Sequence, residues 1–147
     1  MYRDLLVHVD GSEAGRSRVQ FVIDLALRTG ARLSGLHVMP PSDVPPLYKP
    51  SQMDEATANM SLKLASNARD AKKAFYEEVG QRLTDARWLE SNGDVVHGIS
   101  DNARYTDLVI LGQYETQGPQ VAHPLPIAHP VVLRCGRPVF VVPAAVG

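Results

Sequence analysis

The chain has 147 residues, a net charge of −1, 44% hydrophobic residues and 21% charged ones. This length fits one domain with a proper core, and the sequence has no basic run of the kind that binds nucleic acid through its phosphates. The single cysteine, Cys135, excludes a disulfide framework or a thiolate metal site within one chain. Asp10 interrupts the only apolar run near the amino terminus, so no signal peptide is expected, and no apolar stretch approaches the roughly 20 residues that span a bilayer. These features predict a cytoplasmic protein in a reducing compartment.

The amino-terminal third predicts a strand, a helix and a second strand. Residues 5–9 form a near-continuous apolar run, which is typical of a strand covered on both faces. Residues 10–12 indicate a turn, and Ser12 is suited to cap a helix that ends at Gly30. The second strand is expected at residues 31–38.

The middle of the chain predicts a loop and one long helix. Five prolines in residues 39–52 indicate a surface loop rather than a linker between domains. The long helix is expected from about Asp54 to about Ala86, because apolar residues recur three or four positions apart on one stripe. A short, partly polar strand at 87–91 is expected to lie near a sheet edge.

The last part of the chain predicts a helix opened by Gly93 and Asp94, then a buried strand, a short helix and a final strand, the last three at residues 107–112, 127–135 and 138–143. Together these elements predict one α/β domain over residues 1–147. Its five strands are mostly parallel, with right-handed crossovers and helices on both faces.

Several pieces of the sequence carry a family resemblance through their order and spacing: LLVHVDGSEAG, ARLSGLHV, the long middle helix, GDVVHGISDNARYTDLVILG and RCGRPVFVVP. With these pieces the chain resembles a universal stress protein domain from end to end. The resemblance implies an open, adenine nucleotide alpha hydrolase-like sandwich with strand order 3-2-1-4-5. Relatives with two such domains in one chain also exist, so this domain could be one half of a tandem protein.

In that order strands 2 and 3 follow on one side of strand 1, and strands 4 and 5 follow on the other. This puts a topological switch point between strands 1 and 4, where open α/β sheets bind ligands. The resemblance therefore implies a ligand-binding mouth at the carboxyl ends of strands 1, 2 and 4. Its expected residues are Val9, Asp10, Gly11, Ser12, His37, Val38, Met39, Gly112 and Gln113. For Asp10, a contact with adenosine is the alternative to a purely local role in the turn, and the local role is preferred.

Nucleotide-binding members of the family carry a glycine, two residues, a second glycine, nine residues, then a glycine followed by serine or threonine. Counted from Gly112, this spacing falls on Glu115, Leu125 and Pro126. A carboxylate, a bulky side chain and a proline thus replace bare backbone and a hydroxyl, which disfavours a bound triphosphate. The sequence predicts a member that does not bind ATP tightly.

The sequence offers no catalytic residues, no cofactor site and no metal site. Four histidines are expected near the mouth, but they lack the spacing of metal ligands and a companion carboxylate; they are His8, His37, His123 and His129. The chain is therefore interpreted as a non-enzymatic stress-response module. The alternative is a small-molecule or adenine-nucleotide binding protein with an altered mouth, and a weak nucleotide hydrolase is the least supported reading.

The last strand is expected to make a homodimer. The implied strand order leaves this strand at an open edge, and an uncovered apolar edge invites pairing with another chain. The resemblance implies the same, since relatives pair through this strand. The expected interface residues are Pro138, Val139, Phe140, Val141 and Val142, and the protein partner beyond a second copy is unknown.

Overall fold

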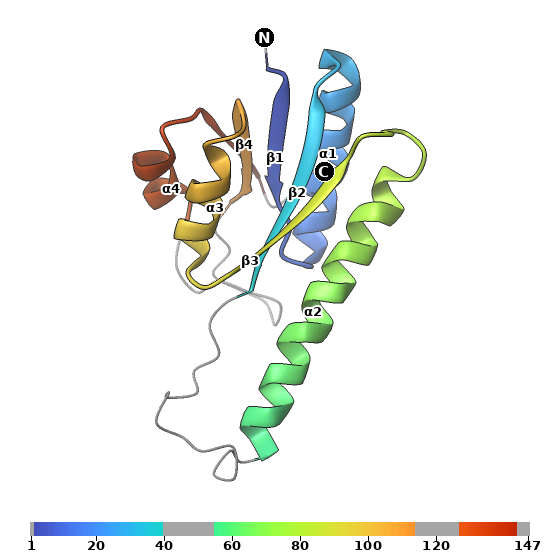
Figure 1. The fold of residues 1–147 in the computed structure, drawn as a ribbon. Coiled ribbons are helices and arrows are strands. Elements are labelled where there is room, and N and C mark those ends of the chain that lie inside the picture. Colours follow the sequence, from blue (N-terminus) through green and yellow to red (C-terminus); the bar gives the residue numbers. More distant parts are fainter. Residues whose placement is uncertain (1, 40–54, 114–126, 144–147) are drawn as a thin grey trace.

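The structure is a computed structural model that describes residues 2–39, 55–113 and 127–143. Its elements, in chain order, are β1 (Asp4–His8), α1 (Glu13–Thr29), β2 (Arg32–Met39), α2 (Glu55–Val79), β3 (Arg87–Asn92), α3 (Val95–Ala103), β4 (Leu108–Gly112), α4 (Ala128–Cys135) and β5 (Val139–Val142). Figure 1 shows one twisted sheet with helices on both faces. All neighbouring strands are parallel and the order is β3-β2-β1-β4-β5. The predicted fold and strand order are confirmed.

Two hydrophobic cores lie on the two faces of the sheet, because successive strand residues point to opposite sides. The first core joins the sheet to α1 and α2, and its buried members include Leu5, Val7, Ile23 and Phe75. The second joins the sheet to α3 and α4, and its buried members include Leu6, Ile99 and Val131. None of the described helices has the length and apolar character needed to cross a membrane.

The helix ends follow local capping chemistry. Ser12 caps α1 with its side chain, and Gly30 ends that helix in the left-handed conformation with φ of 71°, both as predicted. The long helix α2 is shorter than predicted, since it ends at Val79 rather than near Ala86. Gly80, with φ of 53°, turns the chain out of the helix there.

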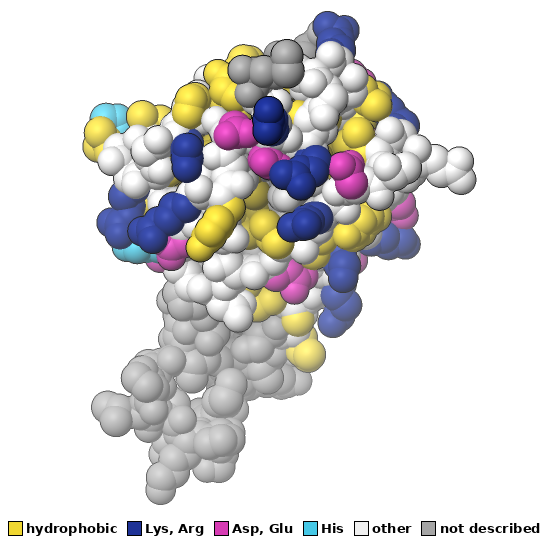
Figure 2. Space-filling view, turned by 45° about the horizontal axis from the view of Figure 1, so that its top comes forward, with side chains coloured by type: hydrophobic (Ala, Val, Ile, Leu, Met, Phe, Trp, Pro, Cys, Tyr) yellow, Lys and Arg dark blue, Asp and Glu magenta, His cyan; other side chains and the backbone are white. Residues whose placement is uncertain are grey.

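The face at the amino ends of the strands carries mixed charges. Figure 2 shows basic and acidic side chains interspersed over this face, without a large area of one sign. Arg32 contacts Asp4 at 2.8 Å from Nε to Oδ1, and Asp107 accepts hydrogen bonds from the backbone N–H groups of Arg3 and Asp4. Asp107 thereby ties the start of β1 to the start of β4.

Gly35 of β2 lets α2 approach the sheet closely. A Cβ at this position would lie 2.7 Å from Cε2 of Phe75, a ring that is fully buried in the first core. Contacts that short do not occur between real side chains, so either the ring or the helix would have to move. The absence of a side chain at Gly35 therefore sets the distance between β2 and α2.

We expect Gly35→Ala to lower the free energy of unfolding by about 2 kcal/mol, the usual cost of overpacking a filled core. Urea unfolding followed by circular dichroism measures this loss. In a Phe75→Leu background the same glycine change should cost less, because the smaller side chain leaves room for the added methyl group. Equal costs in the two backgrounds would show that the ring does not set the spacing.

Candidate functional site

The candidate site is the mouth at the carboxyl ends of β1, β2 and β4. The topological switch point lies between β1 and β4, because β1 pairs with β2 on one side and with β4 on the other. Asp10, His37 and Gly112 all lie at this end of the sheet, as predicted. The contacts of these residues determine which ligands the mouth could bind.

Asp10 organises the turn between β1 and α1. Its Oδ1 accepts hydrogen bonds from Ser12 N at 3.0 Å and from Ser12 Oγ at 2.6 Å, while Ser12 Oγ accepts one from Gly15 N at 3.0 Å. Gly15 is required beside this carboxylate, because a Cβ there would lie 2.6 Å from Asp10 Oδ1. These contacts agree with the preferred interpretation of Asp10 as a turn and capping residue.

Arg18 is the feature of the mouth that sequence reasoning missed. It leaves the second turn of α1, and its side chain is only 6% exposed. Its Nη1 donates a hydrogen bond of 2.7 Å to the backbone oxygen of His8, and its Nη2 lies 3.9 Å from Asp10 Oδ2. The guanidinium therefore reaches from α1 to the end of β1.

The same guanidinium covers Gly112 at the end of β4. A Cβ on residue 112 would lie 1.9 Å from Nη2 and 2.5 Å from Cζ of Arg18. Only a glycine fits against the guanidinium in this position. The glycine that the sequence places at the start of a nucleotide-binding motif thus has a structural explanation within the chain.

Asp10 is held in its charged form. Burial alone raises the pKa of this carboxyl, but the charges of Arg18 and His8 and the two Ser12 hydrogen bonds outweigh that effect, so the pKa lies below its ordinary value of 3.8. The mouth therefore contains a largely buried ion pair between Asp10 and Arg18 at neutral pH.

Two of the histidines expected at the mouth are buried in the sheet. His8 is the buried last residue of β1. His37 is buried on β2, with Nδ1 2.8 Å from the backbone oxygen of Val9 and its ring stacked on Trp88 of β3 at a centroid distance of 6.4 Å. His129 lies exposed in the first turn of α4. Within residues 2–39, 55–113 and 127–143, no three His, Cys, Asp or Glu side chains gather in a way that could hold a metal ion.

The other predicted mouth residues have mixed placements. Val38 is buried in the second core, where a Cβ on Gly98 of α3 would lie 2.9 Å from its Cγ2. The backbone oxygen of Met39 accepts a hydrogen bond from Gly93 N, and Gln113 N donates one to the backbone oxygen of Val142. Four further residues of the sequence predictions lie outside the described part of the chain: Glu115, His123, Leu125 and Pro126.

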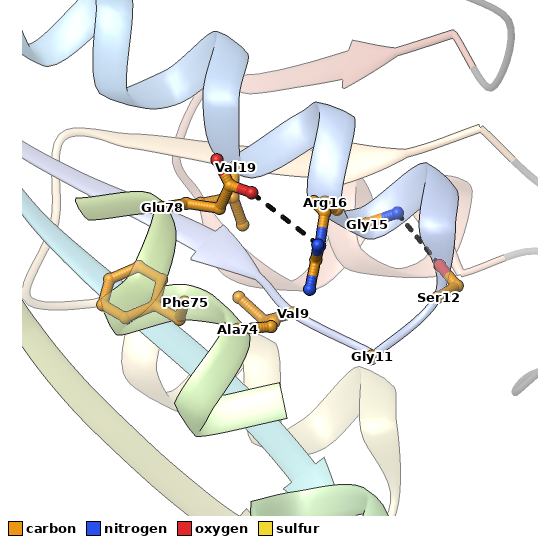
Figure 3. A pocket seen from close by; sticks show the side chains of 9 residues that line it. All are labelled: Val9, Gly11, Ser12, Gly15, Arg16, Val19, Ala74, Phe75 and Glu78. Atoms are coloured by element: carbon orange, nitrogen blue, oxygen red, sulfur yellow. Dashed lines mark hydrogen bonds and ion pairs between the residues drawn. The ribbon is translucent and has the colours of Figure 1, made fainter. Parts of the chain in front are cut away.

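A small cavity lies beside the turn, between α1 and α2 (Figure 3). Its volume is about 40 Å³, enough for a few water molecules and far below the several hundred Å³ of ordinary ligand pockets. It includes three predicted mouth residues, and its full lining is Val9, Gly11, Ser12, Gly15, Arg16, Val19, Ala74, Phe75 and Glu78. Figure 3 shows Arg16 of α1 joined to Glu78 of α2 across the cavity, with 3.8 Å between Nε and Oε1. This cavity has no room for an adenine ring.

The fold and the mouth define an open α/β sandwich of the kind that places ligands at a switch point. The model of the universal stress protein family matches residues 1–143, so the chain belongs to this family. A search among curated proteins found no match.

Solved structures with the same fold come from distant organisms. The universal stress protein UspA from Lactobacillus plantarum is 25% identical with a TM-score of 0.74, and the match covers 96% of this chain and 97% of that one. A universal stress protein from Archaeoglobus fulgidus in complex with dAMP is 16% identical with a TM-score of 0.63, covering 95% and 97%. A family member from Arabidopsis thaliana with AMP bound is 12% identical with a TM-score of 0.67, covering 98% and 93%. At such low identity the last two support the fold alone.

Asp10→Asn tests the buried ion pair. Asparagine keeps an oxygen for Ser12 but removes the negative charge beside Arg18, so we expect a loss of about 3 kcal/mol in unfolding free energy at pH 7. Because folding lowers the pKa of Asp10, its stabilising effect is fully present above the ordinary pKa and is lost as the pH falls through the folded value. The difference between wild type and variant should therefore shrink below about pH 4.

Urea unfolding between pH 7 and pH 3 measures this difference. Asp24→Asn is the matched control, because Asp24 forms an exposed ion pair with Arg82. Exposed pairs contribute at most about 1 kcal/mol, so the control should change the free energy of unfolding very little. A loss for Asp10→Asn that stays constant over the whole pH range would contradict the ion pair.

Proposed function

We propose that this chain is a non-enzymatic stress-response module that acts as a homodimer through β5 and by contacts with other proteins, and that it does not hold ATP tightly. The observation that carries the proposal is the open, apolar edge of the sheet at β5. Within the described ranges β5 pairs with β4 alone, which leaves its outer main-chain groups at the edge.

Both faces of β5 expose large apolar side chains at this edge. Phe140 is 44% exposed and Val141 is 40% exposed. Phe140 stacks on Phe21 of α1 at a centroid distance of 5.2 Å, and Val141 points to the opposite face because strand residues alternate. A second copy related by a two-fold axis would pair antiparallel along β5, covering these side chains and satisfying the main-chain groups.

Binding of an adenine nucleotide is the second candidate function. It is favoured by the relatives solved with dAMP and with AMP, which share this fold. Two features of this chain weigh against a tight site. Arg18 lies against Gly112, and the spacing from Gly112 places Glu115, Leu125 and Pro126 where the family motif has glycines and a hydroxyl.

Val141→Lys tests the homodimer. A two-fold pairing would bring two lysine charges close together, so we expect at least a tenfold weaker dimer, equivalent to about 1.4 kcal/mol. Sedimentation equilibrium at micromolar concentration measures the change. Leu133→Lys is the matched control, because Leu133 is 74% exposed but belongs to α4 and not to the strand β5. A wild-type chain that sediments as a monomer of 16.0 kDa would rule the interface out.

Titration calorimetry tests the absence of a tight ATP site. For the wild type with ATP and magnesium we expect a dissociation constant no lower than about 100 μM, or roughly −5.5 kcal/mol. The variant Glu115→Gly, Leu125→Gly, Pro126→Ser restores the glycines and the hydroxyl of the motif at the existing spacing and should bind more tightly. Micromolar binding by the wild type would favour the nucleotide-binding function instead.

A further inference from the structure

We propose that Arg18 is the resident occupant of the switch point: its guanidinium fills the α1 side of the mouth between β1 and β4 and keeps adenine nucleotides out. This inference rests on the proposed function, since it names the residue that limits what the mouth accepts. It assigns to one side chain of helix α1 a role in ligand selection at the ends of two strands.

Among the described residues, three groups contact the guanidinium in this place. The backbone oxygen of His8 accepts from Nη1 at 2.7 Å, and the Asp10 carboxylate lies 3.9 Å from Nη2. On the third side the guanidinium lies against the bare backbone of Gly112. Since His8 and Gly112 end β1 and β4, these contacts bridge the two strands at the point where the sheet order reverses.

The positive charge of Arg18 is balanced by a carboxylate within the protein. Asp10 carries the opposite charge beside it and is itself anchored by Ser12 N and Ser12 Oγ. The pair as a whole offers an incoming phosphate little net positive charge. Only 6% of the Arg18 side chain is exposed. The guanidinium is therefore packed in the interior and is not available to bind a ligand.

The glycine at residue 112 leaves room for the Arg18 guanidinium. A strand glycine commonly marks a place where another group approaches the backbone closely. Here that group is the Arg18 guanidinium, which leaves no space for even one carbon atom on residue 112. A ligand phosphate that approached Gly112 from the α1 side would meet the same obstacle.

A double-mutant cycle tests the contact between Arg18 and Gly112. We expect Gly112→Ala to lower the urea midpoint of the wild type, and to lower that of Arg18→Ala by less than half as much, because the obstacle is then gone. Equal shifts in both backgrounds would show that the guanidinium does not occupy the space beside Gly112.

Calorimetric titration with AMP tests the exclusion of nucleotide. Arg18→Ala should bind AMP at least about tenfold more tightly than the wild type, while Arg16→Ala should behave like the wild type. Arg16 is the matched control, because it lies on the same helix but is 53% exposed and pairs with Glu78. Unchanged or weaker binding by Arg18→Ala would overturn the role of Arg18 and leave the proposed function standing. Micromolar binding by the wild type would contradict the proposed function itself.

Thermal unfolding with millimolar methylguanidinium gives a second readout for a destabilised Arg18→Ala variant. The vacated space keeps the His8 carbonyl and the Asp10 carboxylate, so the added ion should raise the melting temperature of Arg18→Ala by several degrees more than that of Arg16→Ala. Equal responses of the two variants would contradict a guanidinium-shaped site.

Discussion

A largely buried ion pair joins the first helix of this protein to the centre of its sheet. Arg18 and Asp10 meet at the carboxyl ends of β1 and β4, and Asp10 is also bonded to Ser12, the residue that caps α1. Burial of separate charges costs several kcal/mol for each ion, so each member of the pair depends on the other for its position. The turn, the start of α1 and the end of β4 therefore behave as one unit.

This unit occupies part of the switch point between β1 and β4. A parallel sheet with a switch point offers backbone N–H groups and an open space to a ligand. Here the α1 side of that space is filled by a guanidinium, and the cavity next to it between α1 and α2 holds only about 40 Å³. At the sheet edge Phe140 and Val141 of β5 remain exposed, and these side chains suit a contact between proteins.

Most of the fold could be predicted from the sequence, because buried parallel strands are short apolar runs and helices carry a stripe of period 3.6. The predicted strand ends differ from the observed ones by at most one residue. The end of α2 was wrong for a physical reason. Leu83 and Ala86 continue the apolar stripe and do pack against the first core, but they reach it from the turn region that follows Gly80.

The candidate site was less predictable, because its contacts join distant parts of the chain. Arg18 lies four residues before Val22 and eight before Ala26, on the buried stripe of α1, and a lone arginine in such a stripe is the one local signal. Its partner Gly112 is far away in sequence, so only the strand order brings them together. Val38 was predicted to line the mouth from its position at a strand end, but its side chain points to α3.

The most direct measurement is native mass spectrometry of the untagged protein as purified from the cells that make it. This measurement reports the assembly state and any retained ligand together. The account predicts a mass of twice the 16.0 kDa chain with no added small molecule. A monomer, or a species that carries one adenine nucleotide for each chain, would contradict it.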